Sequence, residues 1–230
     1  MNTSLIKILV TVALLATCGR PVQAQILVPV DSGGTIVDFM TNVFNFTVTD
    51  DFLLADVSLR ISLSHDYISD LEAVLRSPSG TELFLFTAIG ALSPEVEGQK
   101  RGYFEDVLFT DSAPDRLPSD APTRVSGEYQ VQLFPGGGPG GFAEAFGGQM
   151  SAGTWQLLVR DTAQRDEGYL YKQGDDTDMV PDAMPRFGPA EGTQLTLVPV
   201  PEPAAYAGVF GLAALGFGVF WRCRNSRAAG

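Results

Sequence analysis

Cysteine is nearly absent from this chain. Its 230 residues include only two, Cys18 and Cys223, one near each end. If the first 24 residues are removed on export, as argued below, Cys18 leaves with them. The long region between the two ends then contains no cysteine and forms no disulfide, so packing or bound ions must stabilise it.

Histidine is scarcer still, because His65 is the only one. A Ser-His-Asp triad needs a histidine base on a large α/β domain, for which this chain has no room, and no Gly-x-Ser-x-Gly turn is present. The two carboxylates of a glycosidase cannot be recognised among so many acidic residues. We therefore expect no catalytic residue. His65 precedes Asp66 and Tyr67 at the end of an expected strand, which favours a hydrogen-bonding role.

Basic residues are few, with 15 against 27 acidic ones. Setting aside the basic residues and the one glutamate in the two terminal segments leaves 10 basic and 26 acidic residues, a net charge of −16. A charge of this sign repels phosphate backbones, which excludes nucleic acid as a partner. The carboxylates either form a solvated surface or bind a hard cation such as Ca²⁺.

The N-terminal segment has the pattern of a secretory signal peptide. Lys7 precedes the apolar stretch 8–16, and Val22-Gln23-Ala24 fits a small-residue cleavage site, which predicts a signal peptide over 1–24. An alternative interpretation takes 15–18 as a lipoprotein box ending in Cys18, although Thr17 stands where a smaller residue is usual.

The C-terminal segment contains an uncharged apolar run of 18 residues, 204–221. A helix of that length spans about 27 Å, close to the thickness of a hydrocarbon core. Arg222, Arg224 and Arg227 follow it and would stay in the cytoplasm, which places the preceding domain outside. The alternative is a buried helix at the end of a globular domain.

This tail resembles the PEP-CTERM sorting signal of Gram-negative bacteria. The resemblance rests on Pro201-Glu202-Pro203, the apolar run and the arginine cluster, so it covers 199–230. It implies processing by an exosortase-type membrane enzyme and a link to extracellular polysaccharide. We expect a membrane-anchored precursor whose mature form lies at the cell surface or outside the cell.

The central region has the pattern of β-strands. Val57, Leu59, Ile61 and Leu63 alternate with polar residues, which predicts one buried and one solvated face. The expected strands also include 44–48, 71–75, 83–86, 104–109, 128–134, 155–159 and 194–198. No convincing helical stripe lies between the two ends. About eight short strands separated by turn residues predict an all-β sandwich.

The same region resembles the P domain, also called the Homo B domain, over about 36–198. The residues that carry the resemblance are 55–71 (ADVSLRISLSHDYISDL), 75–81, 104–106, 109–113, 127–129, 153–161 and 166–170. In proprotein convertases and subtilisin-like proteases this domain follows the catalytic domain. The resemblance implies a jelly-roll β-sandwich related to galactose-binding-like folds.

Three features depart from the family pattern. Thr110 replaces the first aspartate of the usual pair, the glycine-rich stretch 135–141 is expanded, and 171–192 are inserted before the final strand. We expect both of the latter segments to be surface loops.

The resemblance also implies Ca²⁺ near certain aspartates. We predict Asp70, Asp106, Asp111 and Asp66 as ligands, with Asp161 and Asp166 as weaker candidates. The alternative for Asp70, Asp111 and Asp161 is that they close turns through their own side chains.

Two functions remain open. The first is a non-catalytic surface or matrix module that is sorted by exosortase and binds protein or polysaccharide. The second is an accessory P domain that supports a separate subtilisin-like serine protease.

Overall fold

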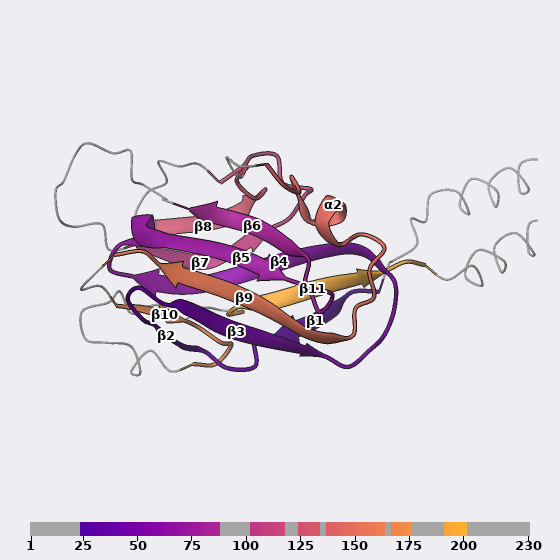
Figure 1. Cartoon of the computed structure of the whole chain (residues 1–230), viewed down its shortest axis with the longest axis horizontal. Helices are drawn as coiled ribbons and strands as arrows, with labels where there is room; N and C mark the ends of the chain where they lie inside the picture. Colours follow the sequence, from indigo (N-terminus) through magenta and orange to yellow (C-terminus); the bar gives the residue numbers. More distant parts are fainter. Residues whose placement is uncertain are drawn as a thin grey trace, which may run out of the picture.

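Two β-sheets packed face to face make up the computed structural model, which describes residues 24–87, 102–117, 124–133, 137–163, 167–175 and 191–201 (Figure 1). The larger sheet has seven strands: β1 (Ile26–Pro29), β2 (Gly34–Ile36), β4 (Leu54–His65), β7 (Gly102–Phe109), β8 (Arg124–Tyr129), β10 (Gly168–Leu170) and β11 (Gln194–Pro199). The smaller sheet has the order β3 (Thr41–Val48), β9 (Gly153–Asp161), β5 (Leu71–Arg76) and β6 (Glu82–Thr87).

All strand pairs are antiparallel except β7 and β8, which run parallel. The prediction of an all-β sandwich is therefore confirmed. Helical structure in the described residues is confined to a 3₁₀ turn, η1 (Ile68–Asp70), and to α2 (Phe142–Phe146).

The long strand β4 organises the larger sheet. One edge of β4 pairs with β7, and the other edge pairs with β11 along its first half and with β10 at its end. β10 and β11 run in the same direction along β4, so they are two parts of one strand position. The chain leaves this position after Tyr171 and returns at Thr193, where Thr193 N–H donates to Tyr171 O at 2.9 Å. The predicted insertion thus leaves the sheet between β10 and β11, which share one strand position, and the segment between Tyr171 and Thr193 is called the excursion below.

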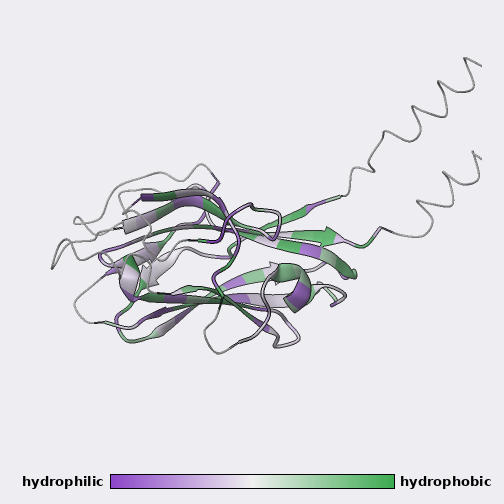
Figure 2. Cartoon of the chain, turned by 90° about the horizontal axis from the view of Figure 1, so that it is seen from above, coloured by the Kyte–Doolittle hydropathy of each residue, from purple (hydrophilic) through white to green (hydrophobic). Residues whose placement is uncertain are grey.

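Apolar side chains between the two sheets form one core. Alternating hydrophobic and hydrophilic bands mark several strands (Figure 2), as the period of two requires. Trp155 is fully buried, and its indole N–H donates to Ser151 O at 2.9 Å. Phe146 of α2 meets Trp155 edge to face at 5.0 Å, so the short helix adds aromatic side chains to the core.

The expectation of a solvated face on β4 is wrong at its C-terminal half. Ser62 and Ser64 have no exposed surface. Tyr171 covers this part of the strand, because its hydroxyl lies 3.0 Å from Ser64 Oγ and its N–H donates to Ser62 O. Small uncharged serines were the signal for a covered face, since a solvated strand face more often carries long charged side chains.

Two predicted elements are also corrected at their boundaries. The strand expected at 128–134 begins earlier and ends at Tyr129, because Arg124–Tyr129 is the segment that pairs with β7. Beyond it, Gln132 N–H donates to Leu85 O of β6, so the chain has crossed to the other sheet. The short strands β1, β2 and β10 were not predicted, and β1 extends the sandwich to Ile26 by pairing with β11.

Candidate functional site

The only histidine lies at the end of β4 in a fully buried pair with Asp161 of β9. His65 Nε2 donates to Asp161 Oδ2 at 3.1 Å, and both side chains have zero exposure. His65 Nδ1 lies within hydrogen-bonding distance of the backbone of Tyr67, 2.9 Å from its oxygen and 3.1 Å from its nitrogen. Both ring nitrogens are therefore engaged inside the protein, and the imidazole links the two sheets.

Two glycines lie opposite this histidine on the neighbouring strands. In the sheet register, His65 lies opposite Gly102 of β7 and Gly168 of β10. A Cβ atom at Gly168 would lie 2.3 Å from His65 Cδ2, and one at Gly102 would lie 2.6 Å from Ile68. Positions 102 and 168 on the two neighbouring strands therefore have no space for a side chain.

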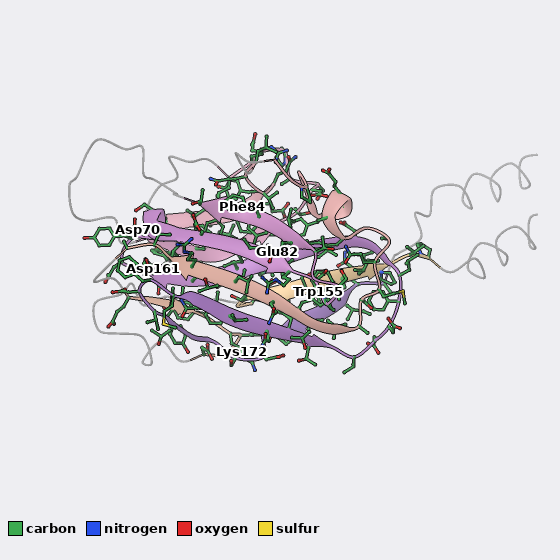
Figure 3. All side chains as sticks on the ribbon, viewed as in Figure 1. Asp70, Glu82, Phe84, Trp155, Asp161 and Lys172 are labelled. Atoms are coloured by element: carbon green, nitrogen blue, oxygen red, sulfur yellow. The ribbon has the colours of Figure 1, made fainter. Side chains whose placement is uncertain are left out.

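Asp70 and Asp161 both organise turns at this end of the sandwich, where Figure 3 labels them. The backbone oxygen of Asp70 accepts hydrogen bonds from Thr162 N–H and Thr162 Oγ1–H at 2.9 and 2.8 Å. The second carboxylate oxygen of Asp161 accepts from Ala163 N–H at 3.0 Å. Asp66 lies in the preceding turn, and its N–H donates to Glu167 O.

Asp106 lies at an irregularity in β7. Its φ of 50° is in the left-handed region, and the pairing of β7 with β4 shifts register there. Asp106 Oδ1 accepts from Ser62 Oγ–H at 2.7 Å and from Gly192 N–H at 3.1 Å. These bonds connect the bulge to β4 and to the returning end of the excursion, which gives Asp106 a structural role.

Asp111 follows β7 and caps α2. Its Oδ1 accepts from Phe142 N–H and its Oδ2 from Ala143 N–H, each at 2.8 Å. Gly141, at the N-cap position, has no side chain that could do this, and a Cβ there would lie 2.3 Å from Asp111 Oδ1. The capping carboxylate therefore comes from a distant part of the chain.

Asp56 is a further carboxylate within electrostatic reach of Asp111. Partial burial of the Asp56 carboxyl raises its pKa above 3.8, and the negative charge of Asp111 adds to this, while a hydrogen bond from Val57 N–H opposes it. Sequence reasoning did not single out Asp56.

The predicted calcium ligands lie in separate contacts in the described part of the chain. Among them, no group of three or more His, Cys, Asp or Glu side chains lies close enough to hold a metal ion. Both oxygens of Asp111 already accept backbone hydrogen bonds. Asp166 lies outside the described residues. Calcium binding by Asp70, Asp106, Asp111 and Asp66 stays a prediction from the sequence.

The predicted sorting tail lies almost wholly beyond the structure. Pro201 is the last described residue, so Glu202, Pro203 and the apolar run 204–221 fall outside, as does nearly all of the predicted signal peptide. Over the ranges that are described, no helix has the length and apolar composition needed to cross a membrane.

The fold and these contacts define a β-sandwich whose only histidine and principal aspartates take structural roles. Residues 54–174 match the family model of the proprotein convertase P-domain, and the chain belongs to this family. In subtilisin-like proteases the P domain is a non-catalytic accessory domain. No curated protein matches the chain.

The solved structures that are similar to the chain include two of a bacterial serine protease. The serine protease of Aeromonas sobria is 15% identical, with 81% of this chain and 29% of that chain covered and a TM-score of 0.37. The same protease in complex with its chaperone is 16% identical, with 83% and 29% covered and a TM-score of 0.36. The chain spans less than a third of either protein, and at these TM-scores the likeness does not establish a shared fold.

Proposed function

We propose that this chain is a non-catalytic P-domain module that is exported, sorted through its C-terminal tail by an exosortase-type enzyme, and binds protein or polysaccharide at the cell surface. The match of residues 54–174 to the P-domain family is the observation that supports a non-catalytic, accessory role. The jelly-roll relation to galactose-binding-like folds is part of the same proposal, and two packed sheets are consistent with it.

The buried histidine supports a non-catalytic role. An acid or base must reach the proton that it transfers. His65 has no exposed surface, and Asp161 and the Tyr67 backbone occupy its ring nitrogens. The full-length chain should therefore not cleave casein or peptides with basic cleavage sites. Hydrolysis that survives stringent purification and is blocked by a serine-directed fluorophosphonate would overturn this part of the proposal.

The sorting proposal rests on the tail sequence. Replacing Pro201-Glu202-Pro203 by alanines should leave the apolar segment attached while export continues, because the apolar run and arginines suffice for insertion. Intact-mass measurement of the parent and the variant in the native host tests this. Equal trimming of both proteins would remove the case for exosortase.

The second candidate function is support of a separate subtilisin-like serine protease. Family membership favours it, since P domains accompany such catalytic domains. Adding the purified chain should then prolong the thermal half-life of a purified subtilisin-like protease that lacks its own P domain. Retention on the organism's purified exopolysaccharide, with no effect on such a protease, would favour the surface module instead.

A further inference from the structure

An exposed apolar row lies at the end of the sandwich from which the chain leaves. Leu53, Met150 and Val200 are 45%, 52% and 41% exposed. Leu53 and Met150 form an antiparallel bridge, so they lie directly opposite one another, and Val200 N–H donates to Leu53 O at 2.8 Å. Leu53 is thus flanked by the other two, and three separate segments contribute one apolar side chain each.

The row is close to the predicted membrane segment. Ala204, where the apolar run begins, lies four steps along the chain from Val200, and an extended chain of four steps spans at most about 14 Å. Pro199, Pro201 and Pro203 favour a stiff extended conformation of about 3.1 Å per residue, which gives roughly 12 Å. The polar layer of a bilayer adds only about 5–8 Å on each side of the hydrocarbon core. A short, stiff tether therefore keeps the row near the bilayer surface.

We infer that the row of Leu53, Met150 and Val200 seats this end of the sandwich on the outer surface of the lipid bilayer. The contact holds Pro201–Pro203 at the membrane surface, within reach of a membrane-embedded processing enzyme. The inference rests on the proposed function, since it requires 204–221 to be inserted in the membrane.

The neighbouring charges indicate which lipid surface fits. Asp50 and Asp51 precede the row, and the hydroxyl of Ser151, the residue after Met150, donates to Asp50 O at 2.6 Å. Carboxylates at this position are repelled by anionic headgroups. The row therefore fits a zwitterionic phospholipid surface, and anionic lipid weakens the contact.

The opposite end of the sandwich provides a matched control. β4 has 12 residues, and the 11 steps from Leu54, at the end that carries the row, to His65 cover about 36 Å at 3.3 Å per step. Met40 lies at that far end, since its backbone oxygen accepts a hydrogen bond from Asp161 N–H. Figure 3 labels Asp161 at the left end of the sandwich, whereas the arrowhead of β11 points to the right end in Figure 1. Met40 is 56% exposed, so it matches Met150 in residue type and exposure.

The test uses the full chain with Cys18→Ser and Cys223→Ser, reconstituted in phosphatidylcholine vesicles. A fluorophore is attached to Met150→Cys or to Met40→Cys, and quenching by lipids brominated near the headgroup is measured. Emission at position 150 should fall about twofold, as expected for a group at the lipid interface, and emission at position 40 should not change. Replacing part of the phosphatidylcholine by phosphatidylglycerol should reduce the quenching.

The remaining outcomes are distinguishable. If the chain is extracted by alkaline carbonate, the membrane anchor itself fails, and this inference fails with it. If the chain stays in the pellet and position 150 is unquenched, or both positions are quenched, only the seating of the row is overturned. Quenching in native membranes but not in pure lipid would assign the row to a partner protein instead.

A second variant tests the apolar side chains. Leu53→Ser with Val200→Ser should reduce quenching at position 150 to the level of position 40, while the chain stays in the carbonate pellet and its melting temperature stays within a few degrees of the parent's. Unchanged quenching would show that the apolar row is not what seats the domain.

Discussion

The buried pair of His65 and Asp161 illustrates, at the scale of the residue, how one side chain restricts its neighbours. The pair is fully buried, and each carboxylate oxygen and ring nitrogen has a hydrogen-bonding contact. Removing one partner of such a pair leaves a buried polar group unsatisfied, which is strongly destabilising. Gly168 leaves the space that the His65 ring occupies, and Gly102 leaves space for Ile68.

Gly168→Ala tests this requirement. The added methyl would lie 2.3 Å from His65 Cδ2 and 3.0 Å from Ile36 Cβ, so the free energy of unfolding should fall by about 1–3 kcal/mol. Gly34→Ala is the matched control, because its nearest contact would be an ordinary 3.6 Å to Phe44. Thermal or urea unfolding measures both. Equal effects of the two substitutions would contradict the close packing around His65.

Asp56 makes the stability depend on pH. Its pKa in the folded state is raised, chiefly by burial, so the folded protein binds this proton more tightly than the unfolded chain does. The contribution of this proton to the free energy of unfolding is therefore fully present below pH 3.8, the pKa of the unfolded chain. It is lost as the pH rises through the higher pKa of the folded protein.

Asp56→Asn should consequently raise the melting temperature slightly at pH 7, by about 1–2 °C, because the amide keeps the oxygen that accepts from Val57 N–H without the charge. The gain should vanish when unfolding is measured below pH 3.8. A variant that is less stable than the parent at pH 7 would show that the Asp56 charge is favourable in the folded state.

At the scale of the element, α2 depends on a carboxylate supplied by another part of the chain. Asp111→Asn should lower the free energy of unfolding by about 1–2 kcal/mol, since a neutral amide oxygen can replace only one of the two charged acceptors. The loss should be the same with calcium and with a chelator, as measured by thermal unfolding. A loss that appears only with calcium would support the ligand role predicted from the sequence.

The long elements were predictable because alternation and burial coincide along them. In β3, β5, β9 and the first half of β4, every second residue is apolar, and the structure buries this set of residues in the core. The three-residue strands β2 and β10 contain too few residues to show a period. They form because β10 pairs with β4 and β2 pairs with β10, and this pairing is not visible in the local sequence.

The site residues were less predictable than the fold. The aspartates at strand ends were recognised, but their partners are far apart in sequence, as with Asp111 and Phe142 or Asp106 and Gly192. A carboxylate that caps a helix or locks a bulge has the same local sequence as one that binds a cation. Only the tertiary contact distinguishes these roles.

At the scale of the whole molecule, the excursion between β10 and β11 leaves and rejoins the sheet at one place. Thr193 N–H donates to Tyr171 O, and Gly192 packs against the backbone of Gln173. The base of the excursion is therefore closed by residues that belong to the sandwich itself.

Deleting 176–190 and joining Asp175 to Glu191 should leave the sandwich folded. Shortening a closed loop of this length changes the closure free energy by only about 1 kcal/mol, in the stabilising direction. The melting temperature should therefore equal or slightly exceed that of the parent, and circular dichroism should be unchanged. A fall of the melting temperature by tens of degrees would show that 176–190 contribute to the core.

The position of β11 also has a mechanical consequence. β11 is the last strand before the tail, and it is hydrogen-bonded along both edges, to β1 on one side and to β4 on the other. A force that pulls on residue 201 acts along the strand axis, so it loads these hydrogen bonds together in shear and does not open them one at a time. A load carried between the tail and the far end of the sandwich would therefore meet the resistance of two strand interfaces at once.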